Sequence, residues 1–89
     1  MTILKETPES LSALVCAELV RAQSVHGPMR SPHEGFAVLK EEVDELWDVV
    51  KDKRGTQREL REEAIQVAAM AMRFILDVVE IEIGDVGAA

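Results

Sequence analysis

The sequence predicts an all-α fold of three helices, in which the long second and third form an antiparallel hairpin. Three observations favour it: a capping residue precedes each predicted helix, apolar residues recur at helical spacing, and no segment alternates strongly in the manner of a strand. Hydrophobic residues make up 47% of the 89 residues but aromatic residues only 3%, which indicates closely packed aliphatic helices. A chain of this length forms one domain, residues 1–89.

The first helix is expected to begin at Thr7-Pro8 and to end near His26. Thr is a favoured N-cap, and Pro is favoured at the first helical position, where its missing N–H costs nothing. The Gly27-Pro28 pair that follows is a typical helix stop.

The second helix is expected to begin at Ser31-Pro32, with Glu34 three residues after the cap. Gly55 is expected to end it, after a basic last turn. Winding the helix at about 100° per residue places its core residues in one stripe: Leu39, Val43, Leu46 and Val50.

The third helix opens on a capping box, Thr56 to Glu59. Its core stripe is expected to contain Leu60, Ala64, Val67, Ala71, Phe74 and Val78. Most of its other faces are also apolar, so the helix must be buried on two sides. We therefore expect self-association as a dimer or tetramer, in which two hairpins complete a four-helix core and the first helix packs across it.

The acidic composition limits the partners of the chain. A formal net charge of −7 argues against nucleic acid and anionic membranes as partners, because both are negatively charged and bind positively charged proteins. The single cysteine, Cys16, cannot form an internal disulfide, and no segment resembles a signal peptide or a membrane span. We expect a cytoplasmic protein in which Cys16 is a core residue rather than a nucleophile.

Carboxylates interrupt the second and third helices close to their core stripes. Glu42 and Glu45 lie about 60° and about 120° to one side of the stripe, and Glu63 and Gln66 take the same offsets on the third helix. Like charges crowded beside apolar neighbours would raise their pKa values or require a counter-ion, and Mg²⁺ or Mn²⁺ suits such hard oxygen ligands. The alternative interpretation is an ordinary solvated face.

These residues resemble the MazG-like all-α nucleotide pyrophosphohydrolases. The signature of that family is E-E-x-x-E on one helix and E-x-x-D on a later one. Here Glu41-Glu42-Val43-Asp44-Glu45 matches the first motif in full, and Glu63-Ala64-Ile65-Gln66 occupies the second. The surrounding segment SPHEGFAVLKEEVDELWDVVK is also similar, so the resemblance covers most of the chain.

The resemblance implies Mg²⁺-dependent hydrolysis of a nucleoside triphosphate, NTP or dNTP, to the monophosphate and pyrophosphate, as in nucleotide-pool housecleaning. It implies that Glu42, Glu45 and Glu63 are the principal metal ligands and that Glu41 is a further ligand or the base that activates water. Glu41 and Glu42 are accordingly the catalytic candidates. Gln66 departs from the family Asp: its amide oxygen can still bind the metal, with one negative charge fewer.

Three further residues are candidates for substrate contact. Arg73 and Lys51 would meet phosphates, although Arg73 is also placed to pair with Asp77 four residues on, and Lys51 suits a helix C-terminus. Trp47 would stack on a base or pack in the core. The alternative function is a catalytically weakened nucleotide-binding module, or an oligomerisation module, of the same fold. A ferritin-like di-metal protein is disfavoured because no E-x-x-H motif is present.

Overall fold

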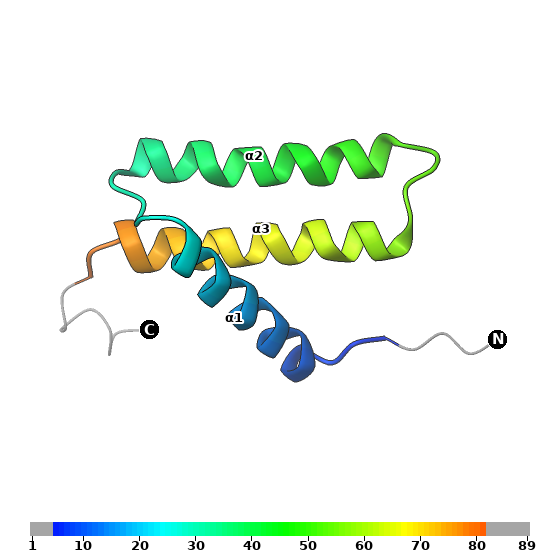
Figure 1. Cartoon of the computed structure of the whole chain (residues 1–89), viewed down its shortest axis with the longest axis horizontal. Helices are drawn as coiled ribbons and strands as arrows, with labels where there is room; N and C mark the ends of the chain where they lie inside the picture. The colour runs from blue at the N-terminus through cyan, green and yellow to red at the C-terminus, as the bar shows by residue number, and fades with distance from the viewer. Residues whose placement is uncertain (1–4, 82–89) are drawn as a thin grey trace.

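The computed structural model describes residues 5–81, which form three α-helices and no strand (Figure 1). They are α1 (Pro8–Val25), α2 (Pro32–Lys51) and α3 (Gln57–Val78). α2 and α3 lie side by side as an antiparallel hairpin, and α1 crosses α3 diagonally. This confirms the all-helical prediction. The ends of the predicted domain, residues 1–4 and 82–89, lie outside the described residues.

Each helix begins where its capping residue predicts. The hydroxyl of Thr7, Ser31 or Thr56 accepts a hydrogen bond from the backbone N–H three residues later. At α3 the bond is reciprocated, because the backbone N–H of Thr56 donates to Glu59 Oε1 at 3.1 Å. Such caps satisfy N–H groups that the helix leaves unpaired, typically worth about 1 kcal/mol each.

The predicted end of the first helix is confirmed and that of the second is corrected. His26 caps α1 in an extended conformation. α2 stops at Lys51, before Gly55, because Asp52 turns to an extended conformation while its N–H donates to the carbonyl of Asp48. Gly55 lies in the connection between α2 and α3, where a side chain would not fit: a Cβ there would lie 2.6 Å from the carbonyl oxygen of Val49.

The core lies mainly between α1 and α3. Its buried apolar residues are Val15, Leu19, Ala22, Met29, Ala69 and Met70, and the half-buried Val38, Leu39, Ile65, Ala68, Phe74 and Val78 pack against them. Gly35 is the buried residue of α2, and a Cβ at this position would come within 2.7 Å of the Phe74 ring. The missing side chain therefore lets α2 approach α3 closely.

The predicted core stripe of α2 is only half correct. Leu39 and Leu46 are half-buried, but Val43 and Val50 are 45% and 53% exposed. The apolar arc of α2 is wider than one helix contact, and the half that faces α3 is centred on Glu42. The other half is left open.

α3 is likewise turned about its axis relative to the prediction. Its polar track, which we define as Glu63, Gln66, Arg73 and Asp77, faces the interior, and Arg73 is buried there. Ile75 and Leu76 are instead 56% and 62% exposed. Of the predicted core stripe of α3, only Ala64 is exposed. The other five residues of that stripe are half-buried: Leu60, Val67, Ala71, Phe74 and Val78. The prediction that Cys16 is a core residue is wrong, since Cys16 lies on the exposed side of α1.

None of the three described helices has a stretch apolar enough and long enough to cross a membrane.

Candidate metal centre and adjoining cleft

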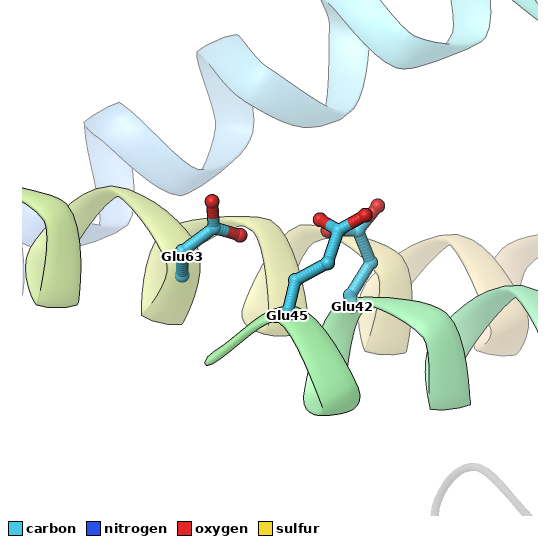
Figure 2. Close-up of side chains that lie close together, drawn as sticks. All are labelled: Glu42, Glu45 and Glu63. Atoms are coloured by element: carbon cyan, nitrogen blue, oxygen red, sulfur yellow. The ribbon is translucent and has the colours of Figure 1, made fainter. Parts of the chain in front are cut away.

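Three glutamates predicted as metal ligands meet between α2 and α3. Glu42 and Glu45, one turn apart on α2, and Glu63 on α3 each offer a carboxylate oxygen, and these oxygens lie within 4.8 Å of one another (Figure 2). Helical spacing aims the first two the same way, and the antiparallel hairpin supplies the third. We call these three residues the carboxylate cluster.

The cluster is partly withdrawn from water. Glu42 and Glu63 are half-buried and Glu45 is exposed. Within the described residues, the Oε2 atom of Glu63 is fully covered and has no hydrogen-bond partner. A covered carboxylate oxygen without a partner is costly, and among residues 5–81 no cation forms an ion pair with any of the three glutamates.

Burial and mutual repulsion make the cluster reluctant to ionise. Burial, followed by the charges of Glu45, Glu63 and Glu41, raises the pKa of Glu42 to about 7. Burial and the neighbouring Glu45 also raise the pKa of Glu63. Like charges at a half-buried site favour the protonated form, and a bound cation reverses this preference.

The residues of the cluster fit a hard divalent cation. Carboxylate oxygens without sulfur or imidazole are the ligands that Mg²⁺ and Mn²⁺ prefer. The Glu63 oxygen that has no partner among residues 5–81 could act as a ligand. Glu42, Glu45 and Glu63 would hold the ion, with its remaining positions filled by water and substrate.

An arginine from α1, which sequence reasoning missed, borders the same region. Arg21 pairs with Glu18 one turn earlier on α1. That carboxylate, and to a lesser degree Glu42, raise the pKa of Arg21. Arg21 and, less strongly, the amide of Gln66 lower the pKa of Glu18. The sequence did contain a signal for Arg21: Glu18 and Arg21 are oppositely charged, lie at i, i+3, and are next to the apolar Leu19 and Ala22.

A cleft of about 530 Å³ opens beside the cluster. Glu41 and Glu42 line it from α2, Arg21 from α1, and Gln66 and Arg73 from α3. Glu42 thus belongs both to the cluster and to the cleft wall. The cleft joins both catalytic candidates, Glu41 and Glu42, to Arg73, one of the three candidates for substrate contact.

Arg73 has a structural role at the floor of this cleft. Its guanidinium is buried, donates to the carbonyl of Gly27 and lies 3.5 Å from Asp77 Oδ2. The backbone N–H of Met29 donates to the same Asp77 oxygen at 2.9 Å. These contacts attach the α1–α2 connection to α3, and they include the predicted pair with Asp77.

The other two candidates for substrate contact lie away from the cleft. Lys51, at the last turn of α2, is 3.4 Å from Asp48, and its Nζ is 5.7 Å from the ring centroid of Trp47. Neither Lys51 nor Trp47 lines the cleft described above. Trp47 is 55% exposed, so it does not pack in the core of this chain.

Comparison with known proteins gives no relative of this chain: no family model, curated protein or solved structure matches it.

Proposed function

We propose that the protein is a Mg²⁺-dependent nucleoside triphosphate pyrophosphohydrolase of the MazG-like kind, acting on the cytoplasmic pool of NTPs or dNTPs. The observation that carries the proposal is the carboxylate cluster, whose three oxygens converge within 4.8 Å beside a cleft of substrate size. The E-E-x-x-E motif supplies two of these ligands, Glu42 and Glu45.

In the proposed reaction a water oxygen bonds to the α-phosphorus, and the bond from that phosphorus to the bridging oxygen breaks, releasing pyrophosphate. A bound Mg²⁺ would neutralise phosphate oxygens and lower the pKa of water. Glu42, Glu45 and Glu63 would hold that ion. Glu41, which is exposed and lines the cleft, would accept the proton of the water.

The test is pyrophosphate release from a panel of NTPs and dNTPs with Mg²⁺ or Mn²⁺. Glu63→Gln should lower turnover roughly a hundredfold, as expected when a group that stabilises the reacting charges is lost. Glu62→Gln is the matched control, because it removes the same charge from the neighbouring, exposed position on α3. Metal-independent turnover, or equal losses in both variants, would contradict the proposal.

We further propose that two copies associate through the open apolar half of the hairpin. The large residues left exposed there are Phe36, Val43, Trp47 and Val50 on α2, Met72, Ile75 and Leu76 on α3, and Val79 at the C-cap of α3. Exposed apolar residues along two neighbouring helices are typical of a protein interface. Light scattering should report a dimer or tetramer at micromolar concentration, and Leu76→Glu should shift it toward monomer; a compact wild-type monomer would contradict this assembly.

The second candidate function is a module that binds nucleotide without turning it over. It is favoured by Gln66, which stands where the family motif has Asp and lies against Glu18 rather than bringing a fourth negative charge. Binding of a nucleotide with Mg²⁺ in calorimetry, without release of pyrophosphate from any member of the panel, would select this candidate.

A further inference from the structure

Three arginines from three different elements line the cleft. Arg21 comes from the last turns of α1, Arg30 from the connection to α2, and Arg73 from α3. All three border the same space of about 530 Å³, and so does Glu42 of the carboxylate cluster. The cleft therefore brings one proposed metal ligand and three cations to the same space.

Arg73 retains hydrogen-bond donors that the protein does not use. A guanidinium has five N–H donors. One donates to the carbonyl of Gly27, and another meets only the sulfur of Met70 at 3.9 Å. Although Nε lies 3.5 Å from Asp77, it is covered and makes no hydrogen bond with the described residues. Because Arg73 is only 5% exposed and its Nε is covered beside Asp77, only donors of its terminal nitrogens are candidates for contact with a ligand in the cleft.

Arg30 is the most available of the three cations. Its backbone N–H donates to Glu34 at 3.3 Å, but among residues 5–81 no carboxylate pairs with its guanidinium. Its side chain is exposed at the cleft mouth. Arg21 by contrast already has Glu18 as a partner.

We propose that the arginines of this cleft bind the pyrophosphate part of the substrate, with Arg30 as the principal contact and the buried Arg73 as a second contact. The inference rests on the proposed function, because Glu42 is both a proposed metal ligand and a residue of this cleft. Planar guanidinium forks match phosphate oxygens, and such charge-assisted bonds are strong. Lys51, at the far end of α2, is not part of this subsite.

Carboxylates that line the same cleft set a condition on binding. Glu34, Glu41 and Glu42 also line the cleft, so a bare polyanion would meet both signs of charge. A divalent cation on the carboxylate cluster would neutralise the acidic side and bridge it to the anion. Pyrophosphate should therefore bind with Mg²⁺ and far less without it.

The experiment measures binding without turnover, by calorimetry of the full chain with inorganic pyrophosphate and with inorganic phosphate, each with and without Mg²⁺. Arg30→Gln should weaken pyrophosphate binding about tenfold, in line with the loss of a charge-assisted hydrogen bond. Arg58→Gln is the matched control, since Arg58 is an exposed arginine on the first turn of α3 that does not line the cleft. It should change binding less than twofold. Inorganic phosphate should bind more weakly than pyrophosphate.

The outcomes separate this inference from the proposed function. Loss of pyrophosphate binding in Arg30→Gln but not in Arg58→Gln supports the subsite, even if no nucleotide is hydrolysed. The subsite is overturned if the wild-type protein fails to bind pyrophosphate with Mg²⁺, or if the two variants weaken it equally, even when nucleotide hydrolysis is found.

Discussion

The polar track of α3 contains two groups of charges, one with oppositely charged partners and one surrounded by like charges. Toward its C-terminal end, Arg73 and Asp77 are buried together and partnered by the connection between α1 and α2. About three turns earlier, Glu63 lies beside other carboxylates, and one of its oxygens is covered without a partner among residues 5–81. Breaking a buried ion pair is costly because it leaves one charge uncompensated, whereas crowded like charges favour binding a cation.

A second comparison isolates the effect of burial on the paired charges. Arg58 and Glu62 form an ion pair at the same i, i+4 spacing on α3 and the same 3.5 Å separation as Arg73 and Asp77. The side chains of the first pair are 87% and 60% exposed, and those of the second only 5% and 14%. Geometry being equal, only the buried pair should matter to stability.

Removing the buried arginine should have the largest effect. Arg73→Ala leaves Asp77 without its cation and the Gly27 carbonyl without its side-chain donor, and should lower the free energy of unfolding by about 3–5 kcal/mol. Arg58→Ala should cost less than about 1 kcal/mol. Urea denaturation of both variants measures the difference, and similar losses would show that burial does not distinguish the two pairs.

Adding a divalent metal ion should stabilise the fold through the carboxylate cluster. Millimolar Mg²⁺ or Mn²⁺ should stabilise the folded chain by about 2–3 kcal/mol if its concentration reaches a hundred times Kd, because only the folded state holds the cluster together. Glu45→Gln should blunt the rise in melting temperature, and Asp44→Asn, an exposed neighbour on α2, should not. A melting temperature indifferent to metal in the wild-type protein would favour the solvated-face interpretation.

The stability of the metal-free protein should depend on pH through Glu42. Its pKa is about 7 in the fold against 4.5 in the unfolded chain, so the folded state binds more protons between these values. Stability from this group is therefore highest below about pH 4.5, falls as pH rises, and is lowest above about pH 7. Solvent screening reduces the effect to about 1 kcal/mol.

Glu42→Gln isolates this contribution to the pH dependence. The difference in melting temperature between wild type and variant should grow in favour of the variant from pH 5 to pH 7.5. Other carboxylates, such as Glu18 with its lowered pKa, titrate in both proteins and cancel. A difference that does not change with pH would show that Glu42 titrates normally.

Introducing the carboxylate of the MazG-like motif at position 66 should have the smallest effect. Gln66→Asp adds a negative charge that attracts the cation, but it removes an amide that lies against Glu18 and adds repulsion there. The shorter side chain also reaches less far. We expect Mn²⁺ affinity to rise no more than about threefold, equivalent to about 0.7 kcal/mol, in a calorimetric titration. A tenfold gain would place residue 66 directly on the ion.

The sequence by itself determined the local structure of this protein. The starts of the helices could be predicted from their N-cap residues, Thr7, Ser31 and Thr56, because capping depends on groups within four residues. The motif spacing also predicted that Glu42 and Glu45 point the same way, since one helical turn separates them. Their meeting with Glu63 was expected from equal offsets on two helices, and the hairpin brings it about.

Only the tertiary structure decided which side of each helix faces inward. α2 and α3 are apolar over arcs wider than one contact, so periodicity could not choose between the half that holds Glu42 and the half that holds Val43. The packing of α2 against α3 and of α1 against α3 shows that choice, and in this arrangement Arg21 and Arg30 line the cleft. Contacts between residues far apart in the chain depend on packing, which a helical pattern does not encode.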